Sequence, residues 1–221
     1  MAEFGATLVD QYGNVWSTPQ TTPISLVQKI DINPSSPGSV NLSVNASSPF
    51  LIAAHGSVTN TIFWLSKING GYVLSYATSQ GIGAVGNVTI YIFGYVIPQP
   101  LPSYGIAIWN SNQQCILTNE TKVMPAPASY GDIGGTNIGY LVDVTVSGKW
   151  AVMPKVMGVI TGIVNTGGLP RPVSSPIDTC AYFDGSTTRI RAMQRSSLTG
   201  ASNISFANSR DQIFAIDVSK F

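Results

Sequence analysis

The residue types that most often carry catalysis are sparse in this chain. His55 is its only histidine, so a histidine-based triad or metal site would have to include it. It stands at the end of a predicted strand, in Ile-Ala-Ala-His-Gly-Ser, and the chain contains neither a G-x-S-x-G nor an H-E-x-x-H sequence. We therefore interpret His55 as a hydrogen-bonded structural residue.

Paired carboxylates are the second candidate chemistry, because two acidic side chains about 5 to 9 Å apart can cleave a glycosidic bond. Asp178 with Asp184, or Asp132 with Asp143, are conceivable pairs. Spacing in the sequence places neither pair across a cleft, and Asp184 precedes a glycine in a sequence typical of a hairpin turn. A glycan-cleaving enzyme is thus the least favoured hypothesis, and we expect no catalytic residues.

Metal and cofactor motifs are equally weak. Cys115 and Cys180 have no second cysteine or histidine at metal-ligand spacing, which favours two ordinary buried thiols. Residues 81–86 fit the pattern G-x-G-x-x-G, but a strand sequence follows them where a nucleotide site needs a helix. A glycine-rich hairpin loop is the better interpretation, and we expect no metal and no cofactor.

Arginines and aromatic residues supply the candidate binding groups. Arg189, Arg191 and Arg195 fall on one face of an extended strand, because side chains alternate along it. Such a row could hold the phosphate or carboxylate groups of a partner or a surface glycan, and a solvated strand face is the competing interpretation. The aromatic residues that could contact a sugar are Trp64, Tyr72, Tyr76 and Trp109.

Charge and hydropathy exclude other classes of function. Only 10% of the 221 residues are charged and the net charge is +1, which predicts no binding to nucleic acid. The first 148 residues carry three basic and six acidic side chains, and the remainder eight and four. No apolar stretch reaches the ~18 residues of a membrane span, and no signal peptide is recognised, so we expect synthesis in the cytoplasm without membrane insertion.

Short β-branched and aromatic runs between turn residues predict an all-β fold. Asn69-Gly70 and Asp184-Gly185 are typical of tight hairpin turns, whereas Pro170, Pro172 and Pro176 indicate a surface connection. The expected strands cover about residues 4–9, 24–32, 39–44, 50–55, 60–67, 72–77, 87–96, 104–109, 114–118, 138–146, 149–153, 156–164, 179–183, 187–193, 202–206 and 212–218.

The prolines at positions 98, 100 and 102 predict a boundary, because proline removes ladder donors and fixes φ. We expect two tandem antiparallel β-sandwich domains, 1–97 and 104–221, joined by a Pro-rich linker at 98–103. An internal echo supports this division. The sequence Phe-Gly-Ala-Thr-Leu-Val-Asp at 4–10 aligns, at a shift of 100, with Tyr-Gly-Ile-Ala-Ile-Trp-Asn at 104–110.

The opening sequence, Phe-Gly-Ala-Thr-Leu-Val-Asp-Gln-Tyr-Gly-Asn-Val-Trp at 4–16 followed by Thr-Thr-Pro at 21–23, resembles the start of small β-rich tail-tip and tail-fibre-associated proteins of tailed bacteriophages. Those begin with an aromatic-Gly strand, an Asn/Asp-x-x-Gly turn and a polar segment. The echo has Gln113 where the turn glycine would stand. The resemblance covers about a fifth of the chain and carries over no catalytic residue.

The resemblance implies a structural component of the virion tail, made in the host cytoplasm, that assembles with other tail proteins or with its own copies and contacts the host surface. The low charge and the mean hydropathy of +0.21 favour self-association, and the fibre resemblance favours a trimer. The alternative is a carbohydrate-binding module for a bacterial surface polysaccharide, which would use the aromatic residues named above.

Overall fold

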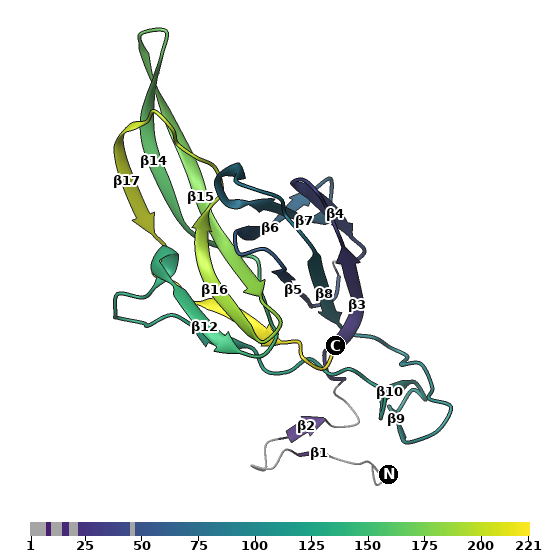
Figure 1. Cartoon of the computed structure of the whole chain (residues 1–221). Coiled ribbons are helices and arrows are strands. Elements are labelled where there is room, and N and C mark those ends of the chain that lie inside the picture. The colour runs from purple at the N-terminus through teal and green to yellow at the C-terminus, as the bar shows by residue number, and fades with distance from the viewer. Residues whose placement is uncertain (1–7, 10–14, 18–21, 45–46) are drawn as a thin grey trace. The chain divides into compact units, whose positions relative to one another are not determined.

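The computed structural model in Figure 1 describes residues 8–9, 15–17, 22–44 and 47–221, and they form an almost entirely β protein. Its two helical segments are single 3-10 turns, η1 (Ser79–Gly81) and η2 (Gly139–Leu141). The all-β prediction is confirmed. No helix in this described part of the chain has the length and apolar character to cross a membrane.

The described residues form eighteen strands. They are β1 (Leu8–Val9), β2 (Val15–Ser17), β3 (Ser25–Ile32), β4 (Gly38–Leu42), β5 (Phe50–Gly56), β6 (Thr61–Ile68), β7 (Gly71–Thr78), β8 (Val88–Gly94), β9 (Ala107–Trp109), β10 (Cys115–Thr118), β11 (Ala128–Tyr130), β12 (Asp143–Ser147), β13 (Trp150–Val152), β14 (Val156–Thr166), β15 (Leu169–Phe183), β16 (Thr187–Gln194), β17 (Ser202–Asn208) and β18 (Ile213–Asp217).

One large mixed sheet contains most of these strands. Its main path runs β11-β18-β13-β5-β15-β6-β7-β4, and the strands β3, β8, β12, β14, β16 and β17 branch from it. The described pairings are antiparallel except that of β15 with β5. Because β5 and β6 pair with β13 and β15, strands from before the proline-rich segment complete their ladders with strands from after it.

The chain divides into two compact units, each built from separated segments. The smaller unit contains 1–29, 45–51 and 92–125, and the larger contains 30–44, 52–91 and 126–221. The predicted linker at 98–103 therefore lies inside the smaller unit, and the tandem arrangement of two sandwiches is not confirmed.

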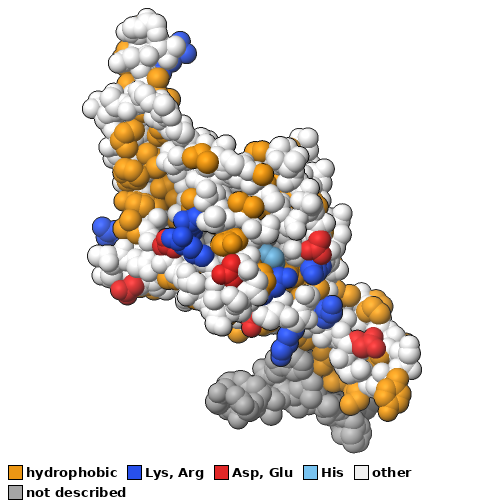
Figure 2. Space-filling model, in the orientation of Figure 1, with side chains coloured by type: hydrophobic (Ala, Val, Ile, Leu, Met, Phe, Trp, Pro, Cys, Tyr) orange, Lys and Arg blue, Asp and Glu red, His pale blue; other side chains and the backbone are white. Residues whose placement is uncertain are grey.

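The core of the larger unit comes from the longest apolar runs. Phe63, Leu74, Ile90, Ile190 and Ile216 are all fully buried. Every residue of β8 is buried, which fits its nearly unbroken apolar sequence, since a strand covered on both faces shows no alternation. The surface in Figure 2 is mostly uncharged, as the composition requires.

Both predicted hairpin turns are present. Asn69 and Gly70 have φ angles of 50° and 82°, the left-handed values that a two-residue turn between β6 and β7 needs. At the β15–β16 turn the carboxylate of Asp184 accepts hydrogen bonds from the backbone N–H groups of Ser186 (2.8 Å) and Thr187 (2.7 Å). Local turn chemistry was thus sufficient to place these hairpins.

The segment with three prolines is a strand, so the prediction of a surface connection there is wrong. Residues 169–178 pair with β14 across the two-residue turn Gly167-Gly168. Hydrogen-bonded and non-hydrogen-bonded pairs alternate from the closing pair of such a turn, which puts Pro170, Pro172 and Pro176 at non-hydrogen-bonded positions. The missing N–H groups therefore point away from β14, where a ladder does not need them.

The internal echo has a counterpart in the backbone. In the smaller unit, Leu8 pairs with Ser17 and Val9 with Val15, while Ile108 pairs with Leu117 and Trp109 with Cys115. The two hairpins thus share one register, including the same irregularity, at a shift of 100. Most of the first copy, 1–7 and 10–14, lies outside the described residues, and so does the greater part of the expected strand 4–9.

Candidate functional site

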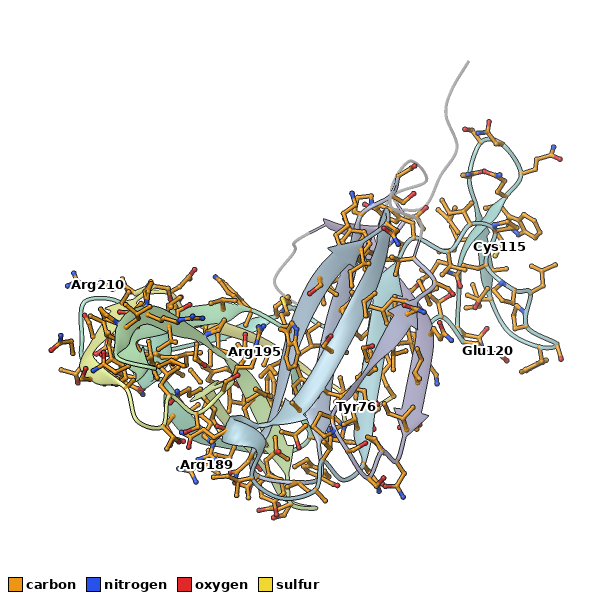
Figure 3. All side chains as sticks on the ribbon, turned by 90° about the horizontal axis from the view of Figure 1, so that it is seen from above. Tyr76, Cys115, Glu120, Arg189, Arg195 and Arg210 are labelled. Carbon is orange, nitrogen blue, oxygen red and sulfur yellow. The ribbon has the colours of Figure 1, made fainter. Side chains whose placement is uncertain are left out.

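The three predicted arginines lie on or next to β16, and each already has a partner in the chain. Figure 3 labels two of them, Arg189 and Arg195. Arg189 makes a two-point ion pair with Asp143 of β12, at 2.8 and 2.6 Å. This contact lowers the pKa of the Asp143 carboxyl, because the guanidinium hydrogen-bonds and stabilises its ionised form. Arg191 donates to the backbone oxygen of Thr59 and to the side chain of Asn60.

Arg195 is paired with a buried carboxylate. Its guanidinium makes two hydrogen bonds, 2.7 and 2.8 Å, with the carboxylate of Asp178, which is fully buried. It also stacks over the ring of Trp64, at 4.1 Å from the ring centre. Burial raises the pKa of Asp178, and the hydrogen bonds from Arg195 oppose that rise.

The four predicted aromatic contacts do not form one platform. The register of β6 and β7 turns Trp64 to the face opposite Tyr72 and Tyr76, because Trp64 pairs with Ser75 while Tyr76 pairs with Phe63. Tyr76 is buried against Gly38, and the Tyr72 ring is covered by Lys67 at 5.5 Å. Trp109 belongs to the smaller unit and is half exposed. A glycan contact by these residues stays a prediction.

The histidine and the two cysteines, which were also candidates for catalysis or metal binding, are buried inside the fold. The His55 side chain is buried with Tyr91, whose hydroxyl lies 3.5 Å from its Nε2 atom. Both cysteines are buried free thiols, and burial raises the pKa of the Cys180 thiol to about 11. Their reactivity is therefore low.

The most distinctive surface of the larger unit is a three-stranded sheet, which we call the arm: β14, residues 169–176 of β15, and β17. In Figure 1 its hairpin of β14 and β15 runs to the tip at residues 167–168, and in Figure 2 hydrophobic side chains follow it. Large apolar side chains are exposed on it at Leu169, Ile204 and Phe206. A strand with this much exposed apolar surface suggests a contact surface.

Glycines on β14 explain how the arm holds its apolar face. A Cβ atom on Gly158 would stand 3.1 Å from the ring of Tyr140, and one on Gly162 would stand 2.8 Å from Ile204. The absence of side chains at these two positions lets Tyr140 and Ile204 lie directly on the strand. Phe206, whose ring centre is 5.5 Å from that of Tyr140, continues the same face.

The two edges of the arm differ chemically. Along β15 the outer edge carries Pro170 and Pro172, which offer no N–H group, and β16 pairs with β15 only from Ile177 onward. Within the described chain β17 pairs with β14 alone, so its other edge is open. No proline and no charged residue occurs from Ser196 to Ser209. Natural edge strands usually carry such protective residues, and β17 lacks them.

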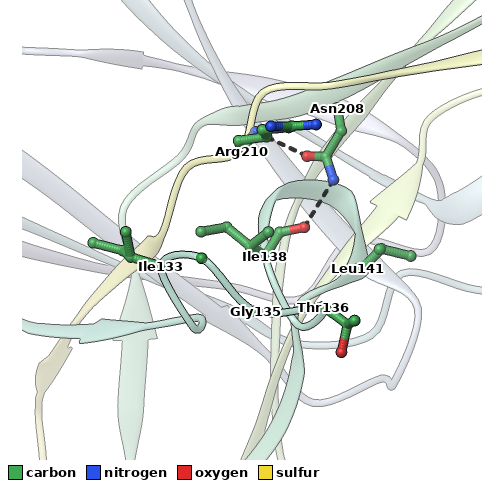
Figure 4. A pocket seen from close by; sticks show the side chains of 8 residues that line it. Ile133, Gly135, Thr136, Ile138, Leu141, Asn208 and Arg210 are labelled. Carbon is green, nitrogen blue, oxygen red and sulfur yellow. Dashed lines mark hydrogen bonds between the residues drawn. The ribbon is translucent and has the colours of Figure 1, made fainter.

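A pocket of about 470 Å³ lies beside the base of the arm (Figure 4). Its lining is mainly apolar, with Ile133, Ile138 and Leu141, and the described lining residues include no carboxylate and no histidine. The side chain of Asn208 closes one wall by donating to the backbone oxygen of Ile138 and accepting from the N–H of Arg210. The pocket can take an apolar group, and Arg210 is the charged residue among its described lining residues.

The smaller unit presents its own exposed apolar residues around the β9–β10 hairpin. They are Tyr95, Ile97, Leu101, Tyr104, Ile106 and Trp109, with Tyr104 91% exposed. In contrast, the β10 residues Cys115, Ile116 and Leu117 are buried. This second surface suggests a further contact with a partner.

Reasoning from the sequence missed the arm. The prolines of 170–176 obscured it, although three prolines of equal parity within an alternating polar and apolar run are compatible with an edge strand. The uncharged stretch around β17 was visible in the sequence, but its position at a sheet edge required the register.

Comparisons with known proteins identify no relatives. No family model, no curated protein and no solved structure matches the chain. Among residues that the structure describes, no group of three or more histidine, cysteine or acidic side chains is arranged to hold a metal ion. The functional assignment therefore rests on the arm and on the sequence.

Proposed function

We propose that the protein is a non-enzymatic structural component of a bacteriophage tail, at the tail tip or associated with the fibres, and that it assembles through the arm. The observation that carries the assembly role is the open, uncharged edge of β17 beside exposed Ile204 and Phe206. Strand addition at such an edge is a common mode of protein recognition. The opening sequence resembles tail proteins, and this resemblance favours a bacteriophage tail as the particle to which the protein belongs.

The polar residues of the larger unit support the same proposal by exclusion. Arg189 and Arg195 are engaged with Asp143 and Asp178, and the carboxylate of Asp184 holds a turn. These groups make contacts within the fold, so the exposed apolar residues and the open edge of β17 are the features that favour assembly.

The genes that flank the coding sequence provide the direct test. A tail tape-measure or tail-fibre gene beside it would support the assignment to a phage tail. A neighbourhood of polysaccharide-processing genes, with no morphogenesis gene, would contradict it.

A carbohydrate-binding module is the alternative, and the half-exposed Trp109 favours it because an accessible indole can stack on a sugar. A glycan array with the isolated protein separates the two functions. Binding to a defined polysaccharide that is lost in Trp109→Ala would favour the alternative. A reducing-sugar assay on the same glycans tests the enzyme hypothesis.

A further inference from the structure

The backbone groups at the open edge of β17 can be identified from the register. Ser209 donates its N–H to the oxygen of Met157, so Ser205, Ala207 and Ser209 face β14. N-terminal to Ser205 the register shifts, because Ile163 pairs with Ser202 and Asn203 has a φ of 51°. Even-numbered residues between Ser205 and Ser209 face the other way, because successive residues of a strand alternate. The C=O group of Ile204 and the N–H and C=O groups of Phe206 therefore point outward, to the edge that has no partner strand in the described chain.

These outward groups are complementary to themselves. If two copies of β17 meet antiparallel about a two-fold axis at Ser205, Ile204 of one copy lies opposite Phe206 of the other. Phe206 presents an outward N–H and Ile204 an outward C=O, so each of the two pairs can form a hydrogen bond between these groups. A shift by one residue would place inward-facing groups opposite outward-facing ones, which disfavours neighbouring registers.

Side chains agree with the same register. Ile204 and Phe206 lie on one face of the arm, so their four side chains would form a single apolar cluster across the axis. They are 44% and 52% exposed in the single chain, which leaves this surface to be covered. Since residues 196–209 carry no charge, nothing along the strand repels an identical strand.

We infer that β17 is a homodimer interface, at which a second copy of the chain adds its own β17 antiparallel about Ser205 and joins two arms into one continuous sheet. This inference deepens the proposed function, because it names the partner that the arm takes. It stands apart from the identity of the particle, since the pairing depends only on the chain itself.

The first experiment measures mass against concentration. Multi-angle light scattering should show the purified full chain moving from 23.4 kDa towards twice that mass as its concentration rises. In Ser205→Lys two like charges would face each other at the axis, and the dissociation constant should rise at least tenfold. Ser205→Thr, equally exposed but neutral, should dimerise like the natural chain. Circular dichroism confirms that both variants fold.

The second experiment tests the register by cross-linking. Ser205→Cys should form a disulfide-linked dimer under mild oxidation, because residue 205 faces its own copy. Ser202→Cys is the matched control, an exposed serine on the same strand. In this register two residues at position 202 stand about 20 Å apart, and they should not cross-link. The natural cysteines are buried and should not contribute.

Three results would overturn the inference: a constant mass of one chain with no Ser205→Cys dimer, a dimer that survives Ser205→Lys, or a mass of three chains as the fibre resemblance implies. None of these would decide whether the protein belongs to a phage tail, because other surfaces could carry that assembly. Conversely, if the β17 dimer is confirmed and the neighbouring genes are unrelated to phage tails, the assignment to a tail is refuted while the homodimer interface stands.

Discussion

Arg195 illustrates what the sequence could predict at the scale of a residue. Strand alternation predicts that it shares a face with Arg191 and Arg189, and in the structure it lies one residue beyond the end of β16. It does not predict the partners, because Asp178 and Trp64 reach Arg195 only through the ladders of β15 with β16 and β6. Long-range pairing therefore turned a candidate binding row into contacts within the chain.

Removing the Arg195 side chain should be strongly destabilising. In Arg195→Ala the fully buried carboxylate of Asp178 loses its counter-charge, and the free energy of unfolding at pH 7 should fall by about 3 kcal/mol. Burial alone would then raise the pKa of Asp178, so the folded variant takes up a proton before the unfolded chain does. The deficit should shrink as the pH is lowered from 7 towards 4.

Urea unfolding at several pH values measures this deficit. The double variant Asp178→Asn/Arg195→Met, which buries no charge, should recover much of the loss. A deficit that grows on acidification would mean that Asp178 is not the group responsible.

Asp184 is a second carboxylate whose contribution to stability should depend on pH. Hydrogen bonds from the backbone of Thr187 and Ser186 lower the pKa of its carboxyl, so it stabilises the fold above the unfolded pKa of about 3.9. In Asp184→Asn the acceptor oxygen remains but the charge is lost. The thermal midpoint should be lower than that of the natural chain at pH 7, and the difference should shrink as the pH falls from about 4 towards the lowered pKa of Asp184. An unchanged difference at acidic pH would contradict this assignment.

At the scale of elements, the sequence predicted what local chemistry determines. The turns at Asn69-Gly70 and Asp184-Gly185 and the strands on either side of them are confirmed, because glycine, asparagine and aspartate act within a few residues. The prediction for 138–146 was wrong at its start, where η2 stands, and β11 was missed altogether. A three-residue strand is too short to show an alternating pattern of polar and apolar residues. Its extended conformation depends on its pairing with β18.

Proline positions in β15 test its register. Val173 lies at a hydrogen-bonded position opposite Gly162, so Val173→Pro should remove a ladder bond, strand a carbonyl and cost about 1–3 kcal/mol of unfolding free energy. Pro172→Ala leaves the ladder with β14 intact and should cost less than about 1 kcal/mol. Urea denaturation of the two variants compares them directly. Equal losses would show that the assigned alternation is incorrect.

At the scale of the whole molecule, composition was enough for the fold class but not for the topology. Both compact units draw on separated segments, and no local signal announces that β6 will pair with β15 more than a hundred residues later. The proline-rich segment at 98–103 interrupts strands, as expected, without separating the units.

Fragments 1–97 and 104–221, produced separately, should therefore both remain unfolded. The first lacks β13 and β15, which pair with β5 and β6, and the second lacks β5 and β6 in turn. Far-UV circular dichroism and amide dispersion in NMR spectra would report their state, and mixing the two should restore some β signal. A stably folded 104–221 fragment would restore the tandem arrangement.

The prolines of β15 also determine where growth of a sheet must stop. If each arm couples through β17, the terminal strands of the joined sheet are two copies of β15, and both present Pro170 and Pro172 outward. At this edge Pro170 and Pro172 offer no N–H group to an incoming strand. Each chain would therefore have one edge that can pair, and the sheet would not extend beyond the dimer. The same uncharged sequence that invites pairing is thus kept from propagating into a fibril.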